Sequence, residues 1–168
     1  MPGEWKRFRT VYDPAAPQSD RREWRPTLKF VAKVCQEQGI NLKRVHVHYH
    51  PEGEDNIPTS HPFGEAEYWN GVIYLCAWDE DTILHELAHV WSESWHTAKW
   101  ASLYLSLCEH YMSREDFMEA VVGTAAEMPV VRHALKRIYG ITVKVGKRTL
   151  KESRPSCDEQ KVHGQHRS

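Results

Sequence analysis

One segment, DTILHELAHVWSESWHTAKW at residues 81–100, constrains the fold more than any other part of the 168-residue chain. In its first half, apolar residues surround His85 and His89, which stand four positions apart. Because each residue of an α-helix advances by about 100°, these two imidazoles lie on one side of a helix and one turn apart. Two imidazoles in that relation can bind one metal ion, so the segment predicts a helix that carries a metal site.

His85, Glu86 and His89 form the motif H-E-x-x-H. In this motif the two histidines hold zinc and the glutamate acts as a base towards water. We therefore predict Zn2+ as the cofactor, His85 and His89 as metal ligands, and Glu86 as the catalytic residue. A chance match would also have to follow a hairpin signal, lie among apolar residues and precede a further histidine.

A catalytic zinc ion usually has three protein ligands. His96 lies two helical turns beyond His89, so it can bind the same ion only if the helix ends near residues 92–94. The sequence Ser-Glu-Ser at those positions is a poor helix former, and Thr97 can cap a new helix. We predict His96 as the third ligand. The alternatives are acidic residues on later helices: Glu109, Glu119 and Glu127.

The segments before this helix predict a small β-sheet. Residues 25–39 have apolar residues at helical spacing and end at a glycine, and residues 42–50 alternate like a half-buried strand. Asn70-Gly71 between two β-prone runs predicts a two-residue hairpin turn. Its first arm, residues 65–69, suits the edge of a sheet, whereas the apolar second arm suits an interior position.

The segments around and after the metal-site helix predict where helices begin and end. Asp79 can cap the metal-site helix itself. A second helix is expected from about Ala98, and a third after a cap at Ser113. Pro129 interrupts the third helix, and a fourth ends at Gly140.

Charge is distributed unevenly along the chain. Residues 1–44 carry ten Lys/Arg against five Asp/Glu, and residues 141–168 carry seven against three, whereas residues 45–98 carry ten acids and no Lys or Arg. We predict a basic irregular arm at residues 1–23, a folded domain at residues 24–140, and a basic extended or disordered tail from residue 141 to 168.

Other features bound the class of protein. No apolar run approaches the roughly 18 residues needed to span a bilayer, and the N-terminus lacks the apolar core of a secretory signal. We therefore expect no membrane partner and a cytoplasmic location, which for a phage-encoded chain is the host cytosol. The four cysteines form no C-x-x-C pair, so neither a zinc ribbon nor a redox dithiol is expected. Three are interpreted as core residues and Cys157 as a thiol of the tail.

The motif and the segment that follows it resemble a known family. HELAHVW at residues 85–91 and HTAKW at residues 96–100 are similar to the SprT-like zinc metallopeptidases, which include the Spartan-type proteases. In that family the third histidine opens the next helix in a short H-G-x-x-F/W segment, and Thr97 stands here in place of the glycine. Small phage and actinobacterial metallopeptidase-like proteins look similar as well. The resemblance covers roughly residues 65–111.

The resemblance implies a zincin-like α+β fold with a small twisted mixed sheet, an active-site helix and further C-terminal helices. It also implies a zinc metalloendopeptidase with Glu86 as general base. The edge arm of the hairpin would hold an extended peptide by strand addition, with Glu65, Glu67 and Tyr68 as substrate-binding residues. The alternative is a non-catalytic zinc-binding protein, or a phage assembly protein, that has kept the motif.

Partners follow from the same charges. The acidic central block predicts a protein or peptide substrate with basic residues near the cleaved bond. The basic termini could separately bind nucleic acid. An oxyanion formed during peptide hydrolysis would need a second donor. Four side chains are candidates for that donor: Tyr68, Tyr104, His110 and Tyr111.

Overall fold

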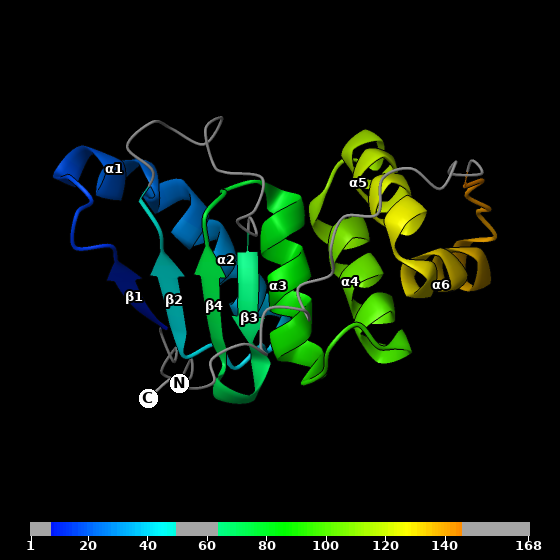
Figure 1. Ribbon diagram of the computed structural model, residues 1–168, viewed down its shortest axis with the longest axis horizontal. Helices are drawn as coiled ribbons and strands as arrows, with labels where there is room; N and C mark the ends of the chain where they lie inside the picture. The colour runs from blue at the N-terminus through cyan, green and yellow to red at the C-terminus, as the bar shows by residue number, and fades with distance from the viewer. Residues whose placement is uncertain (1–7, 50–63, 146–168) are drawn as a thin grey trace, which may run out of the picture.

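The computed structural model describes residues 8–49 and 64–145 (Figure 1). It is a mixed α+β structure with a four-stranded sheet in the order β1-β2-β4-β3. The first three strands in that order run parallel, and β3 pairs antiparallel with β4. The strands are β1 (Arg9–Tyr12), β2 (Arg44–Val47), β3 (Gly64–Glu67) and β4 (Val72–Leu75).

The sheet confirms the expected places of the hairpin arms. β4 lies between β2 and β3, and its residues Ile73 and Leu75 pair with Val45 and Val47 of β2. These four side chains are all buried, as period-two alternation with one face towards a core requires. Within the described residues β3 pairs with β4 alone, so it is the edge strand that the sequence predicts.

The turn between β3 and β4 differs from the predicted two-residue turn. Glu67 pairs with Val72, and Tyr68–Asn70 form one turn of 3-10 helix, η2. Of the two residues expected to adopt positive φ, Gly71 alone does so, with φ of 63°. Its carbonyl oxygen accepts a hydrogen bond of 2.8 Å from the amide of Lys43. The turn is therefore shaped by the segment before β2, which a local reading of Asn-Gly cannot include.

Five helix boundaries lie at residues that the sequence marks. Side chains of Asp79, Thr97 and Ser113 accept hydrogen bonds from the first turns of α3, α4 and α5. Gly39 and Gly140 end α2 and α6 in the left-handed conformation. The longer helices are α2 (Arg25–Gln38), α3 (Glu80–Ser92), α4 (Ala98–Tyr111), α5 (Arg114–Glu127) and α6 (Pro129–Tyr139).

The N-terminal region corrects one expectation. Residues 1–23 are predicted to be irregular, but within the described part β1 and a short helix, α1 (Gln18–Glu23), occupy residues 9–23. β1 forms because its backbone pairs with β2 over four residues, and the amide of Arg9 donates to Lys43. That pairing partner lies more than thirty residues away, so no local pattern announces it. Residues 1–7 lie outside the described part.

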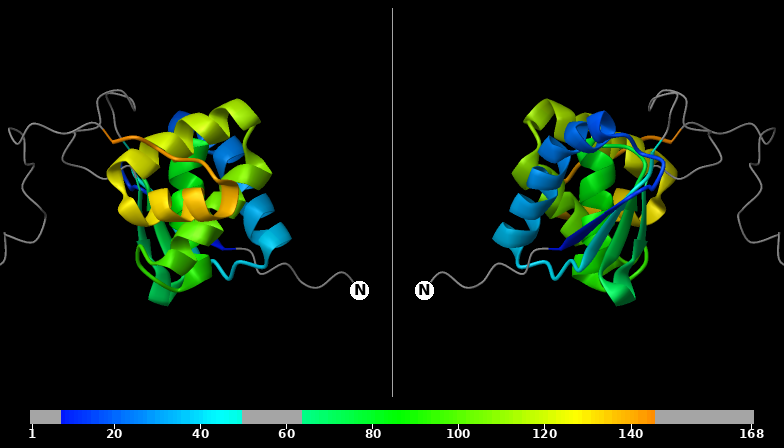
Figure 2. Two further views of the ribbon diagram at one scale, coloured as in Figure 1. Left: turned by 90° about the vertical axis from the view of Figure 1, so that its right-hand side faces the viewer. Right: turned by 90° about the vertical axis from the view of Figure 1, so that its left-hand side faces the viewer.

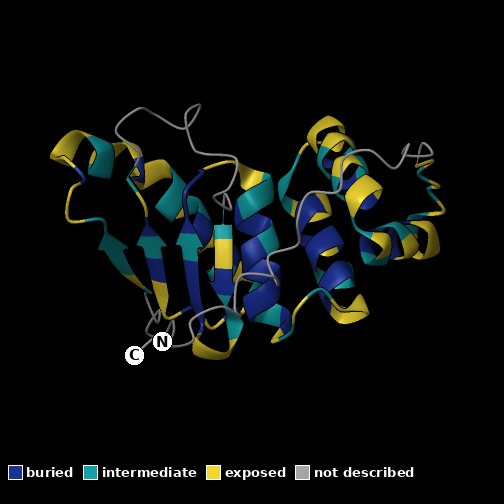
Figure 3. Ribbon diagram, viewed as in Figure 1, coloured by how far each residue is buried: buried dark blue, intermediate teal, exposed yellow. Residues whose placement is uncertain are grey.

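The helices form two groups around α3. α2 and α3 cover one face of the sheet, and α4, α5 and α6 gather on the far side of α3 (Figures 1 and 2). In Figure 3, α3 and α4 are largely buried, whereas α1, α5 and α6 show exposed stretches. α3 therefore lies between the sheet on one side and α4 on the other.

Within the described residues, no helix combines the length and apolar composition needed to cross a lipid bilayer.

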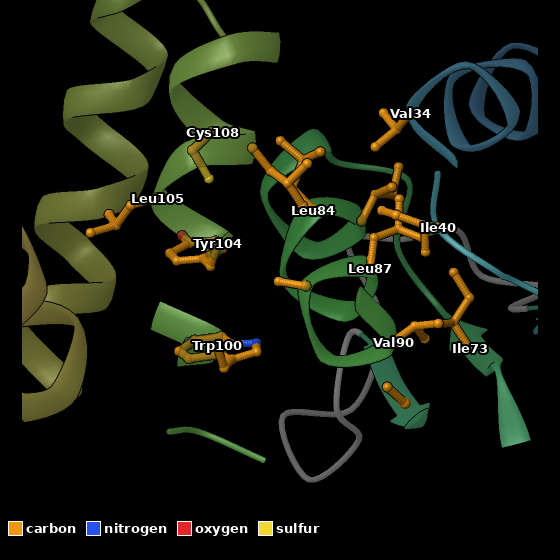
Figure 4. Close-up of a cluster of buried hydrophobic side chains, with 14 of the residues drawn as sticks. Val34, Ile40, Ile73, Leu84, Leu87, Val90, Trp100, Tyr104, Leu105 and Cys108 are labelled. Atoms are coloured by element: carbon orange, nitrogen blue, oxygen red, sulfur yellow. The ribbon is translucent and has the colours of Figure 1, made fainter. Parts of the chain in front are cut away.

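The core explains why α3 is held in place. Its residues Leu84 and Leu87 are fully buried between Ile73 of the sheet and the aromatic residues Trp100 and Tyr104 of α4 (Figure 4). Burying a leucine side chain stabilises a fold by roughly 1.5–3 kcal/mol, so this helix is fixed by packing and not by propensity alone. Two of the predicted core cysteines are buried and one is half-buried: Cys76, Cys108 and Cys35. Cys157 lies outside the described residues.

The C-terminal region is described only at its start. Residues 141–145 form no helix or strand, and Ile141 and Val143 pack against the core while they remain half-buried. The remainder of the predicted tail, residues 146–168, lies outside the described part, so its character stays a prediction.

Candidate metal centre

The end of α3 brings the third histidine back towards the first two. α3 ends at Ser92, and Glu93 adopts a left-handed conformation with φ of 51°, which reverses the chain direction. The carbonyl of Ser92 accepts a hydrogen bond of 2.9 Å from Lys99 Nζ, so an otherwise unpaired helix-terminal group is satisfied. Thr97 then caps α4. The helix therefore stops where a third ligand at His96 requires it to stop.

Three imidazole nitrogens converge at this turn. His96 Nε2 lies 3.1 Å from His85 Nε2 and 3.1 Å from His89 Nε2. Zinc binds imidazole nitrogen at about 2.0–2.1 Å, and two ligands of a tetrahedral ion therefore lie about 3.3 Å apart. Within the described residues, these three histidines are the group of side chains that could hold a metal ion. The donor set and its spacing fit zinc.

The backbone carbonyl of Ser94 fixes the tautomer of His89. His89 Nδ1 lies 2.9 Å from Ser94 O. A carbonyl oxygen can only accept, so Nδ1 carries the hydrogen and the lone pair of a neutral ring is on Nε2. That lone pair points at the convergence point. Hydrogen bonds of this kind orient metal-ligating histidines in many sites.

Two tryptophans cover the faces of His89. Trp100 stacks on its ring with centroids 5.0 Å apart and planes 21° apart, and Trp95 stacks at 5.0 Å and 25°. Trp100 is fully buried, whereas Trp95 is 54% exposed. The cluster thus has a packed inner wall and an aromatic outer rim.

Burial keeps the three imidazoles in the form that binds metals. Removal from water, followed by the effect of the neighbouring imidazoles, lowers the pKa of His85 to about 3 and that of His96 to about 4. The pKa of His89 is lowered by burial as well. Neutral imidazole is the ligand, so protons compete weakly with a metal here.

Glu86 follows His85 on α3, and its side chain lies in a different environment. Its side chain is only 6% exposed, and burial, followed by the charge of Glu65, raises the pKa of its carboxyl to about 8. The first residue of β3 packs against it, because a Cβ atom added to Gly64 would lie 2.8 Å from Glu86 Cγ. A carboxyl that exchanges its proton near neutral pH suits general acid–base chemistry.

The acidic alternatives for the third ligand lie elsewhere. Glu109 is exposed and accepts a hydrogen bond of 2.6 Å from the hydroxyl of Tyr139. Glu119 and Glu127 are exposed on α5, and neither belongs to the metal-binding group. The structure therefore brings His96, and not these acids, to the other two histidines.

The predicted substrate-binding residues occupy the edge strand and the turn after it. Glu65 is exposed on β3. Glu67 accepts hydrogen bonds from the hydroxyl of Tyr74 at 2.8 Å and from Asn70 Nδ2 at 3.2 Å, so its carboxylate is already engaged. Tyr68 lies on η2, with its ring centroid 6.4 Å from that of Trp95. Of these residues, Tyr68 is the one joined to the cluster through ring contacts.

Two oxyanion candidates have hydroxyl groups with other partners. Tyr104 donates to Asp81 Oδ1 at 2.5 Å, although its ring lies 5.6 Å from that of His85. Tyr111 donates to Glu37 Oε2 at 2.8 Å, and His110 packs against the Tyr111 ring. Tyr68, which is half-buried on η2 with its ring near that of Trp95, is therefore the tyrosine candidate that remains.

Sequence reasoning missed three contributors to the site. Ser94 acts through its backbone, which no residue pattern reveals. Gly64 leaves room for the side chain of Glu86 because it has no side chain of its own. Its position before the hairpin does not predict that contact. Trp100 is a buried core residue, and its contacts with the rings of all three histidines are not indicated by its apolar character alone.

Comparisons with known proteins leave the site to be judged by its own chemistry. No protein-family model matches this chain, and neither the curated proteins nor the solved structures searched contain a significant match to it.

Proposed function

We propose that this chain is a zinc-dependent metalloendopeptidase with a zincin-like arrangement of its active-site helix. The observation that carries the proposal is the convergence of the His85, His89 and His96 Nε2 atoms, together with the buried carboxyl of Glu86, the residue that follows His85 on α3. A purely structural zinc site needs no acid–base group beside its ligands, and such sites are usually closed by a fourth protein ligand.

The roles divide between the metal and the protein. Zinc bound by the three histidines would polarise the scissile carbonyl and make water a stronger acid. Glu86 takes the proton of the attacking water and delivers it to the leaving amine nitrogen. Burial of its side chain supports this role, because a carboxyl removed from water holds a proton long enough to pass it on. We assign the donation to the developing oxyanion to Tyr68, whose ring lies 6.4 Å from that of Trp95.

The edge strand supports a peptide as the substrate. In the part of the chain that the structure describes, β3 pairs only with β4, and an extended peptide can add along its other side as a further strand. Gly64 at the start of this strand packs against Glu86, so a peptide along β3 passes the proposed base. A small-molecule hydrolase would have no use for such an edge.

The first test replaces the proposed base. Glu86→Gln keeps the size of the side chain but cannot accept the proton, so it should retain zinc and lose at least 100-fold in peptide hydrolysis, in line with typical general-base contributions of about 10²–10⁴. Glu80→Gln makes the same change at an exposed position of the same helix and should leave both properties unchanged. Metal content by mass spectrometry and cleavage of a peptide library provide the readouts.

Two outcomes would reject the assignment. Full activity in Glu86→Gln would remove that residue from the mechanism. Zinc bound by the wild type with no cleavage of any peptide would favour the alternative of a non-catalytic zinc-binding or assembly protein.

The second test concerns the third ligand. His96→Ala should lower zinc occupancy strongly, because one of three imidazoles is lost. Alanine at each acidic alternative should leave the occupancy unchanged, because all three side chains are exposed and outside the cluster. These variants are Glu109→Ala, Glu119→Ala and Glu127→Ala. Normal zinc content in His96→Ala would move the ligand elsewhere.

A further inference from the structure

Three aromatic side chains, two of them exposed and one half-buried, form a patch next to the histidine cluster. This aromatic patch consists of Tyr68, Trp69 and Trp95. The Tyr68 ring lies 5.1 Å from the Trp69 ring in an edge-to-face contact and 6.4 Å from the Trp95 ring. Trp69 is 65% exposed and Trp95 is 54% exposed.

The two tryptophans of the patch are exposed, whereas other large aromatic side chains of the protein are buried. Trp24, Trp100 and Tyr104 are buried almost completely. A contiguous group of exposed aromatic rings commonly marks an interaction surface, because rings contribute large contact areas at low entropic cost. The patch therefore has a surface available for a ligand.

The position of the patch links it to the proposed active site. Trp95 stacks directly on His89, one of the three converging imidazoles, and lies 5.1 Å from the ring of His96. Tyr68 and Trp69 follow β3 without a break in the chain. The start of β3 packs against Glu86, so the strand runs from the proposed base towards the patch. A chain laid along β3 would reach the patch within a few residues of the reacting bond.

We propose that the aromatic patch is a subsite that binds an aromatic side chain of the peptide substrate, within one or two residues of the cleaved bond. The position of the subsite relative to a cleaved bond rests on the proposed function. Binding of an aromatic peptide to the patch does not depend on hydrolysis. Offset or edge-to-face contacts with Trp69 and Trp95 would hold the ring of the substrate.

The charges around the patch favour a peptide over a nucleic acid. Exposed rings can also stack on bases, but nucleic acids need cations nearby to neutralise their phosphates. Residues 64–98 contain no Lys or Arg, and the exposed carboxylates of Glu65 and Glu93 lie on the segments that carry the patch. The nearest cation in sequence, Lys99, donates to the carbonyl of Ser92. An anionic backbone would be repelled here.

The test uses Trp69, because Trp95 also supports a proposed metal ligand. Trp69→Ala removes the most exposed ring of the patch without touching His89. Trp78→Ala is the matched control: it is another partly exposed tryptophan, but it follows the opposite end of β4 and packs against Trp24. Both variants should keep the zinc content and the circular dichroism of the wild type.

The cleavage readout compares peptides that differ by one residue. The best-cleaved peptide of a library is resynthesised with Phe, Leu or Ala at each of the positions that flank the scissile bond. At one of these positions, wild type should prefer Phe over Ala by about tenfold in kcat/KM, and Trp69→Ala should reduce that ratio to about twofold. Trp78→Ala should keep the full ratio. Equal ratios in wild type and Trp69→Ala would overturn the inference.

A binding readout separates this inference from the proposed function. Fluorescence anisotropy of labelled Phe and Ala peptides is measured with Glu86→Gln alone and combined with Trp69→Ala. Tighter binding of the Phe peptide that is lost with Trp69 supports the subsite, even if no peptide is hydrolysed by the wild type. Cleavage by the wild type without any Phe preference in rate or binding would reject the subsite and leave the proposed function intact. Tighter binding of a labelled oligothymidylate than of any peptide would also reject it.

Discussion

The indole ring of Trp100 lies nearly parallel to the imidazole of His89, and its Nε1–H donates to the carbonyl oxygen of His85 at 3.4 Å. The same indole meets the rings of His85 and His96 edge-on, with centroids 4.7 and 4.5 Å away. One buried side chain of α4 therefore contacts all three imidazoles that converge on α3. Trp100 therefore contributes both to the packing of α4 against α3 and to the orientation of the three imidazoles.

Trp100→Ala should weaken both the fold and the metal site. Loss of a buried tryptophan costs about 3–5 kcal/mol in the free energy of unfolding, because the cavity is only partly refilled. Zinc affinity should fall as well, since the inner wall of the three imidazoles is removed. Trp100→Phe should restore part of both, because it keeps a ring at the same position. Urea denaturation of the zinc-free protein and zinc titration against a competing chelator would measure the two effects.

The opposite result would be informative about the site. If Trp100→Ala lost stability but bound zinc as tightly as the wild type, the indole would pack the core without positioning the ligands. Stability and affinity are measured separately for that reason.

The end of α3, before Glu93, is the helix boundary that local sequence rules predict least well. Helix ends at Gly39 and Gly140 follow glycines, and caps at Asp79 and Thr97 follow from side-chain chemistry, so these boundaries could be predicted. The end of α3 carries no such signal. It was inferred because His96 could reach the other histidines in no other way, and the structure places a left-handed glutamate there.

That conformation leads to a prediction about stability. A residue with a Cβ atom pays roughly 1–2 kcal/mol in the left-handed region, whereas glycine does not. Glu93→Gly should therefore raise the free energy of unfolding by about 0.5–1 kcal/mol, the remainder being offset by the entropy of glycine in the unfolded chain. Glu93→Val should lower it, because a β-branched residue fits this region poorly. Thermal unfolding of the three proteins in the presence of zinc would order them. A less stable glycine variant would contradict the argument.

The parts that sequence could not predict share one physical cause. β1 exists because of its pairing with β2, and the turn before β4 is shaped by a hydrogen bond between Gly71 and Lys43. The contact between Gly64 and Glu86 also joins distant segments. Each depends on tertiary contacts, whereas the helix caps and the i, i+4 spacing of the histidines are local and were predicted.

Stability of the zinc-free protein should depend on pH from both sides. The folded state lowers the pKa of its three clustered imidazoles from 6.5, to about 3 for His85 and about 4 for His96. As pH falls below about 6.5, these histidines bind protons in the unfolded chain but not in the folded state, so the free energy of unfolding falls. Glu86 acts in the opposite direction, because its pKa rises from 4.5 to about 8. As pH rises from 4.5 towards 8, the unfolded chain releases a proton that the folded state retains, and the free energy of unfolding falls.

Three imidazoles outweigh one carboxyl below about pH 6.5, so the zinc-free protein should be most stable between about pH 6.5 and 7. Glu86→Gln should remove the decrease above about pH 7, which is on the order of 1 kcal/mol, because only the last part of the rise of the Glu86 pKa, from about 7 to about 8, lies there and one pKa unit corresponds to about 1.4 kcal/mol. Glu80→Gln, exposed on the same helix, should leave it in place. Urea denaturation at a series of pH values, in chelator, measures the profile. An unchanged alkaline decrease in Glu86→Gln would assign it to another group.

The last prediction concerns the acidic block and the charge of the substrate. Residues 45–98 contain ten acids and no Lys or Arg, and Glu65 and Glu93 are exposed near the histidine cluster. Three further acids of the block lie outside the described residues: Glu52, Glu54 and Asp55. A surface of one charge sign raises the local concentration of oppositely charged ligands. We therefore expect peptides with Lys or Arg near the cleaved bond to be preferred at low salt.

Salt separates this preference from contacts made by rings. At 1 M salt the Debye length is about 3 Å, so the preference for basic peptides should shrink, whereas a preference for an aromatic residue should persist. Glu65→Gln should reduce the low-salt preference severalfold, and Glu115→Gln, an equally exposed acid on α5, should not. Cleavage of a peptide library by each variant at low and at high salt measures the preference for basic peptides and the preference for an aromatic residue. Equal cleavage of acidic and basic peptides at low salt would show that the acidic block is a solvated surface without a role in substrate choice, because a field strong enough to select substrates has to act most when screening is weakest.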